Sequence, residues 1–381
     1  MGGLLDKPVT EKTIETGDSS RMQWVAIAMQ GWRPEMEDEH IAIADLGDEL
    51  AGVGLYCVFD GHGGRAVSAF VKQHFAKEFV RLTSEVGRTK FGKNKAKKRQ
   101  CGVLIEASEY EAILKNTFHE MDVIIRDPAN AQTLSRLVGK VPGGAIEDLK
   151  KQLNAVQAKQ QKGGLSAEDQ VTMKEAVTKL HKYEQADKGE DFVADNVGCT
   201  SVCVMVRQKD IVCANAGDSR AVLCRNGKAE PLSFDHKPED ETEKTRIEKA
   251  GGYLDTKNGG ARVNGNLNLS RSLGDLEYKK NTELGPEEQI ICSTPDVIVK
   301  ELLPEDEFIV LACDGVWDVV SNQEACDFVR PKLLEKQDLS SIATALLDHC
   351  LSSDPRQTDG LGTDNMTAVI VKLTESSTWT S

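Results

Sequence analysis

Short apolar runs with the length and β-branched composition of buried strands occur throughout the chain. Longer segments repeat apolar residues at helical spacing, as Val67, Phe70 and Phe75 do. The Asn226-Gly227 pair predicts a hairpin turn. Strands and helices do not alternate regularly, which favours a layered α+β domain over a doubly wound parallel sheet. The predicted strands are 24–29, 40–46, 54–59, 200–207, 210–215, 221–225, 297–302, 308–313 and 366–373, and the predicted helices outside 87–196 are 65–86, 239–250, 322–335 and 339–351.

The segment 87–196 differs in character from its surroundings. It opens on a basic stretch, 88–99, which fits either a solvated linker or a nuclear-localisation or polyanion-binding patch. Helical spacing returns over 103–126 and again over 145–161 and 167–186. We expect a charged helical insertion that is attached to the surface of the domain and lies outside its core.

The chain has 381 residues, of which 39% are hydrophobic and 28% charged, as in ordinary globular proteins. Its net charge of −14 disfavours nucleic-acid binding, and it would repel an anionic substrate unless cations gather at one point. No apolar stretch approaches the roughly 20 residues of a membrane span, and no secretory leader opens the chain. The ten cysteines show no zinc spacing and no disulfide framework, so we expect a soluble intracellular protein with reduced thiols.

Three aspartates stand at the mouths of predicted buried strands. Asp60 and Asp314 each follow an apolar run and precede a glycine, and Asp364 lies shortly before another run. A hairpin turn is the alternative explanation of Asp-Gly, but a helical segment follows both pairs. With Glu37 and Asp38, these acids predict a site for a hard cation such as Mg²⁺ or Mn²⁺, because clustered carboxylates suit such ions and repel one another without them.

Arg33 adds a phosphate-binding group to this prediction. The following residue, Pro34, favours an extended backbone at Arg33, and on an extended segment Arg33 and Glu37 project to the same face. The planar guanidinium binds phosphate oxygens with two hydrogen bonds. An arginine beside a carboxylate site for two metals therefore indicates a centre that processes phosphate.

The chain resembles the metal-dependent, type 2C serine/threonine protein phosphatases over 20–373, interrupted by the insertion 87–196. The resemblance implies a sandwich of two antiparallel β-sheets flanked by α-helices, with metals in a cleft at one edge. It leaves 1–19 and 374–381 as terminal tails. The segments that carry it are, in order, WRPEMEDEH, FDGHGG, NAGDSRAVL, ARVNGNLNLSRSLGD, LACDGVWDVV and GTDNMTAVIV.

This resemblance implies two Mg²⁺ or Mn²⁺ ions in the active site. Asp60 resembles the carboxylate that bridges both metals, and Gly61 the residue that lends its backbone carbonyl. Glu37 is similar to the ligand of one metal, while Asp314 and Asp364 are similar to ligands of the other.

The remaining roles also follow from the resemblance. Arg33 resembles the phosphate-binding arginine, His62 the general acid, and Asp38 the acid that holds metal-bound water. Asp218 and Asp318 resemble part of a weaker third-metal site. The implied reaction is hydrolysis of phosphoserine and phosphothreonine by a water that bridges two metals, without a covalent enzyme intermediate.

The expected partners are phosphorylated proteins. We expect a monomeric signalling enzyme in the cytoplasm, with nuclear or membrane-associated locations as alternatives. Gly2 is a candidate N-myristoylation acceptor, although Asp6 stands where the simple pattern has Ser or Thr. The start MGGLLDKP resembles that of some animal family members, which favours lipidation, and an ordinary flexible end is the alternative.

Two other functions compete with this one. The segment from His349-Cys350 to Arg356 fits the bare outline of cysteine-dependent phosphatases, which need a thiolate in a loop that opens a helix. Cys350 instead ends a predicted helix, where the dipole disfavours an anion, and Asp354 and Pro355 oppose the function further. A phosphoprotein-binding module without turnover would be indicated by a missing metal acid, and the sequence retains all of them.

Overall fold

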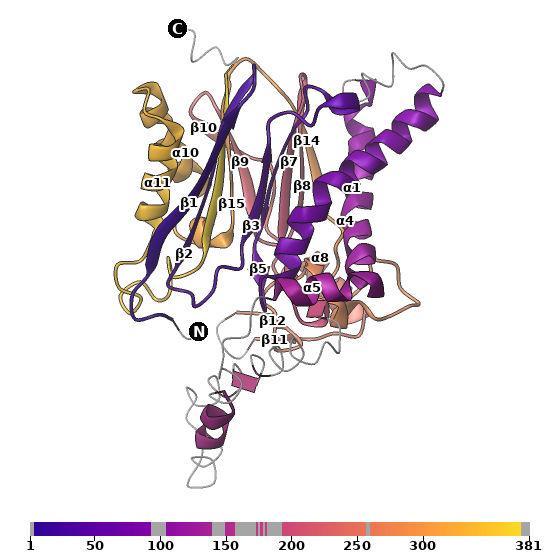
Figure 1. Cartoon of the computed structure of the whole chain (residues 1–381), viewed down its shortest axis with the longest axis vertical. Coiled ribbons are helices and arrows are strands. Elements are labelled where there is room, and N and C mark those ends of the chain that lie inside the picture. The colour runs from indigo at the N-terminus through magenta and orange to yellow at the C-terminus, as the bar shows by residue number, and fades with distance from the viewer. Residues whose placement is uncertain are drawn as a thin grey trace.

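Within the described part of the chain, two antiparallel sheets pack face to face and helices cover both outer sides (Figure 1). This architecture confirms the predicted α+β class and the sandwich. No helix among the described residues is long and apolar enough to cross a bilayer. The computed structural model describes residues 4–92, 104–138, 149–156, 173, 176–177, 180, 193–256 and 260–374.

The first sheet has the strand order β1-β2-β16-β15-β9-β10. Strands β9 and β10 form the predicted hairpin, whose turn residues Asn226 and Gly227 have φ of +48° and +74°. Positive φ at both central positions is what a tight two-residue hairpin requires. The strands are β1 (Val9–Asp18), β2 (Met22–Gly31), β16 (Met366–Leu373), β15 (Asp306–Ala312), β9 (Arg220–Arg225) and β10 (Lys228–Pro231).

The second sheet has the order β14-β8-β7-β4-β3. Its inner face meets the first sheet, where Tyr56 of β4 and Leu311 of β15 are fully buried in one cluster. Central strands such as β4 are covered on both faces, which explains why their sequences are continuous apolar runs rather than alternating ones. The strands are β14 (Asp296–Glu301), β8 (Asp210–Ala216), β7 (Ser201–Val206), β4 (Gly54–Phe59) and β3 (Glu39–Ile43).

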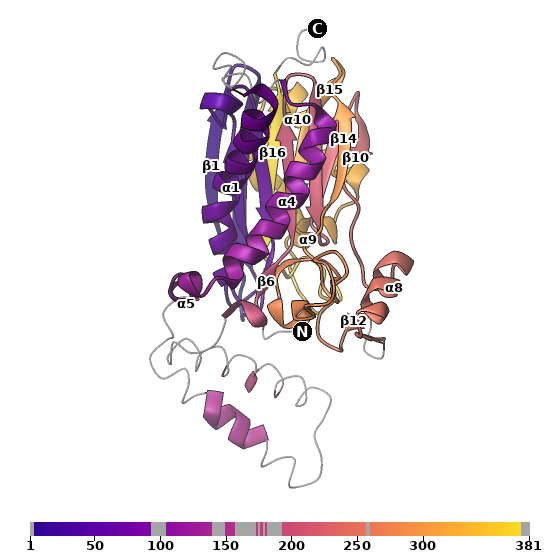
Figure 2. The same cartoon turned by 90° about the vertical axis from the view of Figure 1, so that its right-hand side faces the viewer.

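Helices form the outer layers. The pair α10 and α11 packs on the first sheet, and α1 and α4 lie side by side across the second (Figures 1 and 2). Short 3₁₀ turns occur at Asp48–Leu50, Pro128–Asn130, Val193–Asp195 and Leu276–Lys279. The α-helices are α1 (Ala66–Phe91), α4 (Ala107–Arg126), α5 (Ala131–Leu137), α8 (Glu241–Lys249), α9 (Asp314–Trp317), α10 (Asn322–Leu334) and α11 (Leu339–Cys350).

Two small sheets lie at one end of the sandwich. One has the order β13-β6-β5, with bounds Leu273–Gly274, Gly198–Cys199 and Gly61–His62. The other pairs β11 (Leu254–Asp255) with β12 (Arg262–Val263). The first of these brings the segment that follows β4 next to segments about 140 and 210 residues further along the chain.

The prediction of an N-terminal tail over 1–19 is wrong for residues 9–18, which form the edge strand β1. The strand pairs with β2 from Val9 opposite Gly31 to Asp18 opposite Gln23. Its side chains are mostly polar and exposed, so no apolar pattern marks it. Backbone hydrogen bonds to β2 hold it in place, and these carry no sequence signal.

The prediction that 87–196 is attached to the surface is wrong for α4, which belongs to the buried helix layer on the outer face of the second sheet. Phe118 of α4 meets Phe75 of α1 edge-on, with ring centroids 5.3 Å apart, and Tyr110 stacks on Phe79. These side chains belong to the same buried cluster as the outer face of the second sheet. Amphipathic spacing predicts the helix correctly, but it does not say which surface the apolar face covers.

Several predicted features fall on residues that the structure does not describe. The helices predicted over 145–161 and 167–186 are described only in part, and residues 149–156 are helical. The features outside the described residues are Gly2, most of the basic stretch 88–99, and the tail from 375 onward.

Candidate metal-dependent active site

The ends of three strands bring the predicted aspartates together. Asp60 directly follows β4, Asp314 lies two residues after β15, and Asp364 lies two residues before β16. Because β15 and β16 are antiparallel neighbours, the end of one lies beside the start of the other. A Cβ on Gly315 would lie only 2.0 Å from the carbonyl oxygen of Asn365. The Asp314 turn therefore packs directly against the backbone beside Asp364.

Glu37 is tied to both of these turns. A Cβ on Gly61 would lie 2.2 Å from the Glu37 carbonyl oxygen, so glycine is needed for this approach. The Ser68 hydroxyl donates to the same carbonyl at 2.5 Å, and the Gly64 amide donates to the Glu37 carboxylate at 3.1 Å. The Glu37 amide in turn donates to Asn365 Oδ1 at 2.9 Å. These bonds fix Glu37 between the two turns.

Asp38 lies deep in the acid cluster. The residue is 5% exposed, and neither carboxylate oxygen has a hydrogen-bond partner of good geometry among the described residues. An Asp38 oxygen, an Asp60 oxygen and the Cys313 sulfur lie within 4.8 Å of one another. Burial raises the pKa of Asp38 to about 7; the nearby Thr367 hydroxyl opposes this shift, and the Asp364 carboxylate adds to it. A buried carboxylate without a partner is costly, and a bound cation relieves that cost.

Negative charge is concentrated over the whole cluster. Burial raises the pKa of Asp60 well above its usual range, and the carboxylates of Asp38 and Asp314 raise it further. Burial likewise raises the pKa of Asp314, with Asp218 as the next cause. Arg33 supplies a positive group, and its Nη2 donates to Asp364 Oδ2 at 2.5 Å while its side chain stays 43% exposed. The guanidinium is therefore both anchored and open to a ligand.

Asp218 and Asp318 lie beside the main cluster. Burial raises the pKa of Asp318, Lys237 opposes this shift, and Asp218 adds to it. Lys237 Nζ donates to Asp218 Oδ2 at 2.6 Å, and the sequence did not predict this contact. No spacing in the sequence identifies this lysine, because the two residues come from different loops.

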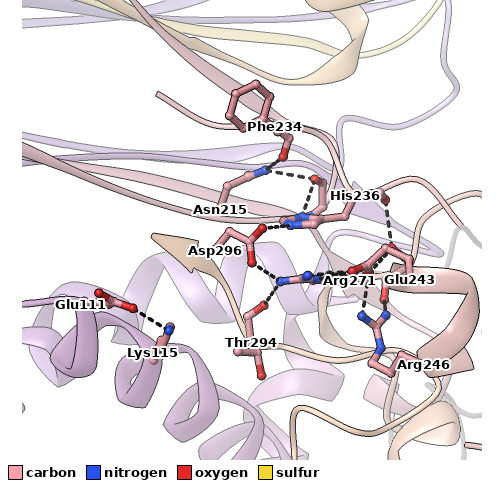
Figure 3. A network of polar contacts seen from close by, with 12 residues as sticks. Glu111, Lys115, Asn215, Phe234, His236, Glu243, Arg246, Arg271, Thr294 and Asp296 are labelled. Carbon is pink, nitrogen blue, oxygen red and sulfur yellow. Dashed lines mark hydrogen bonds and ion pairs between the residues drawn. The ribbon is translucent and has the colours of Figure 1, made fainter. Parts of the chain in front are cut away.

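An ion-pair network fixes the loop that carries this lysine (Figure 3). Arg271 lies 2.7 Å from a Glu243 oxygen and 2.8 Å from Asp296, and Arg246 binds the other Glu243 oxygen at 2.7 Å. His236 Nε2 lies 3.2 Å from Asp296. The network joins α8, the edge strand β14 and the two loop segments that carry His236 and Arg271 into one unit.

His62 lies next to the acids on the small strand β5. Its Nε2 lies 2.7 Å from Asp275 Oδ2. Burial lowers the pKa of His62, but the Asp275 carboxylate outweighs burial and leaves the pKa above its ordinary value. Asp275 was not among the predicted residues, although it ends the SRSLGD segment that carried part of the resemblance.

The donor set fits hard divalent cations. The acids offer carboxylate oxygens, and the Gly61 turn packs closely against the Glu37 backbone beside them. Burial raises the pKa of the Cys313 thiol well above its usual range, so it is not a ready thiolate ligand. Oxygen donors without thiolate or imidazole favour Mg²⁺ or Mn²⁺ over Zn²⁺.

The cysteine-phosphatase alternative is wrong. Cys350 is the last residue of α11 and is buried. Burial raises the pKa of its thiol to about 12, so the nucleophilic thiolate is not formed near neutral pH.

Comparisons with known proteins identify the family of the chain. A sequence model of the family "Protein phosphatase 2C" matches residues 22–141 and 138–358. "Probable protein phosphatase 2C 11" of Oryza sativa subsp. japonica is 36% identical over 375 residues, which cover 98% of this chain and 91% of that one. "Protein phosphatase 2C 1" of Paramecium tetraurelia is 36% identical over 377 residues, covering 98% and 99%.

Solved structures match the fold. A phosphatase from Toxoplasma gondii superimposes with a TM-score of 0.62 at 23% identity, covering 96% of each chain. A serine-threonine phosphatase 2C from the same organism gives 0.62 at 18% identity, covering 95% of this chain and 99% of that one. The fold, the acid cluster and the sequence matches together define a metal-dependent serine/threonine protein phosphatase. The chain belongs to the protein phosphatase 2C family.

Proposed function

We propose that the acid cluster holds two Mg²⁺ or Mn²⁺ ions and that the chain uses them to remove phosphate from phosphoserine and phosphothreonine in proteins. Asp60 would contact both ions, and Gly61 would add its carbonyl oxygen. Glu37 would hold one ion, and Asp314 and Asp364 the other. Bound cations would neutralise the phosphoryl group and lower the pKa of a coordinated water.

One observation carries this proposal: buried carboxylates gather at one point with too few positive partners. Asp38 has two buried oxygens that no described residue satisfies, and the pKa of Asp60 is raised by burial and by surrounding carboxylates. An arrangement of this kind is unfavourable by itself and becomes favourable when cations bind. The cations would also offset, at the site, the net charge of −14 that would otherwise repel a phosphorylated substrate.

The chain's own side chains complete the reaction. Arg33 is anchored by Asp364 and half-exposed, so it can bind phosphate oxygens and orient the ester. His62 holds a proton for the Ser or Thr oxygen that leaves. Asp38 accepts a hydrogen bond from the attacking water. No covalent enzyme intermediate is needed.

A weaker third cation site would use Asp218 and Asp318. Lys237 already neutralises one Asp218 oxygen, which supports weak rather than tight binding there. For the cellular setting we propose a monomeric signalling enzyme in the cytoplasm, with phosphorylated proteins as substrates. Nuclear and membrane-associated locations, the latter through myristoylated Gly2, are the alternatives.

Turnover of a phosphothreonine peptide with Mn²⁺, with Mg²⁺ and with EDTA tests the reaction. We expect phosphate release only with a divalent cation. His62→Gln should slow the peptide about 10²- to 10⁴-fold while sparing an aryl phosphate, whose oxygen leaves without a proton. Arg33→Ala should slow both esters similarly. Peptide binding without phosphate release would instead identify a binding module, and turnover in EDTA would refute the metal site.

A further inference from the structure

The small sheet β13-β6-β5 brings together residues far apart in sequence beside the acids. His62 of β5 lies opposite Gly198 of β6, and Gly198 lies opposite Gly274 of β13. Asp275 follows β13 directly, so its carboxylate reaches across Gly198 to the imidazole. The resulting contact joins His62 Nε2 to Asp275 Oδ2 at 2.7 Å, between residues 213 positions apart.

Gly198 makes this contact possible. A Cβ at this position would lie 2.3 Å from Asp275 Oδ2 and 2.7 Å from His62 Nε2. Gly198 does not have a positive φ, so the backbone itself does not demand glycine. Glycine is therefore needed at this position because a side chain would collide with Asp275 and His62, and not because of the backbone conformation.

Asp275 is rigidly held. It is 1% exposed, has a left-handed φ of +49°, and its amide donates to the Val197 carbonyl at 3.0 Å. The Ser272 hydroxyl donates to the same oxygen that meets His62, at 2.5 Å. A carboxylate fixed by its backbone and a second donor can orient a flexible ring.

Helix α4 supports this loop from behind. The Gly274 amide donates to Asp122 Oδ1 at 2.9 Å, and Lys279 Nζ donates to Asp122 Oδ2 at 2.7 Å. Lys279 also donates to the Ser272 carbonyl at 2.7 Å. The segment on both sides of Asp275 is therefore anchored to the core helix layer.

We propose that Asp275 is a positioning residue for His62: it binds Nε2 and leaves Nδ1 as the nitrogen that faces the leaving oxygen. The proposal rests on the proposed general-acid role of His62. Because Asp275 accepts a hydrogen bond only from an Nε2 that carries a proton, it fixes the ring orientation and the tautomer of the neutral imidazole. The His62 side chain remains 23% exposed, so part of the ring stays open to the site.

A double-mutant cycle tests the proposal with wild type, Asp275→Asn, His62→Gln and the double variant, all with saturating Mn²⁺. Asp275→Asn keeps the shape and removes the charge. We expect kcat on a phosphoserine peptide to fall about 10- to 100-fold, the range found for residues that orient a metal-ligating histidine in the same way. KM and aryl phosphate turnover should change little. In the His62→Gln background, Asp275→Asn should cause no further loss.

Two further variants complete the design. Gly198→Ala keeps both His62 and Asp275 but adds a methyl group that pushes their side chains apart. It should therefore slow the phosphoserine peptide and spare the aryl phosphate, even if Asp275→Asn folds poorly. Asp195→Asn is the matched control, because it also replaces an aspartate that pairs with a basic side chain, Lys280. It should leave the turnover of both esters unchanged.

The outcomes separate the two levels of the argument. If His62→Gln slows only the peptide but Asp275→Asn costs the same factor in both backgrounds, Asp275 has only a structural role and the positioning proposal is overturned. Equal losses on both esters in Asp275→Asn overturn it as well. If His62→Gln slows both esters equally, the general-acid role fails and the positioning proposal fails with it.

Discussion

Replacing Asp60 by asparagine should stabilise the metal-free protein while abolishing its stabilisation by divalent cations. Burial is the largest cause of the raised pKa of Asp60, and the surrounding carboxylates are the next largest. Asparagine has nearly the same shape without the charge, so it relieves the repulsion and also removes the proposed bridging ligand. A purely structural acid cluster would not give these two opposite effects.

The size of the first effect follows from the geometry. Ligand atoms of Asp38 and Asp60 lie within 4.8 Å of each other. Two unit charges at that distance repel by roughly 3 kcal/mol at an effective dielectric constant of about 20. Because the pKa values of both Asp38 and Asp60 are raised, protonation already relieves part of this repulsion at neutral pH. We therefore expect the metal-free variant to gain about 1–3 kcal/mol.

Denaturant unfolding in EDTA and at a Mn²⁺ concentration of 100 times Kd measures both effects. Wild type should gain about 2.7 kcal/mol from the ion, and Asp60→Asn close to none. Calorimetry should show the matching loss of Mn²⁺ binding. Asp18→Asn removes one exposed charge at the far end of β1 and serves as the control. An Asp60→Asn protein that is less stable in EDTA, yet gains as much from Mn²⁺ as wild type, would refute the reasoning.

Two further predictions concern the framework. Phe118→Ala removes a buried ring of α4 and should lower the free energy of unfolding by about 3–5 kcal/mol, whereas Val123→Ala, at a position 60% exposed on the same helix, should change it by less than about 0.5 kcal/mol. Equal effects in urea unfolding would contradict the placement of α4 in the core. Burial alone would raise the pKa of Glu243, but Arg271 and Arg246 lower it to about 2, so its contribution is complete above the unfolded pKa near 4.3 and is lost as the pH falls toward 2. Between pH 5 and 2, the free energy of unfolding should fall by roughly 3 kcal/mol more in wild type than in Glu243→Gln, and parallel pH profiles would contradict this.

The positions of the acids could be predicted from the sequence because each is tied to a local signal. An apolar run that ends in Asp60-Gly61 or leads to Asp314-Gly315 marks both the strand and the turn that follows. That these turns meet depends on β15 and β16 being neighbours, which no local pattern specifies. The resemblance to a known family supplied this part of the prediction.

Three contacts escaped prediction because they join distant segments. Asp275 meets His62 across 213 positions, Lys237 meets Asp218 from another loop, and Asn365 meets the Glu37 amide. Each of these residues has an ordinary local explanation as a turn or surface residue. Only the sheet order and the glycines that permit close approach give them their roles.

Helix α4 shows the same limit on a larger scale. Its apolar spacing predicts a helix with one buried face, yet the surrounding segment looks like a charged insertion, and the two observations together suggest surface attachment. In the structure the buried face covers the second sheet and α1, while Asp122 on the same helix holds the loop that carries Asp275. The helix therefore serves the core and the site at once. A deletion that begins before the end of α4 would therefore remove both the cover of the second sheet and the support of the Asp275 loop.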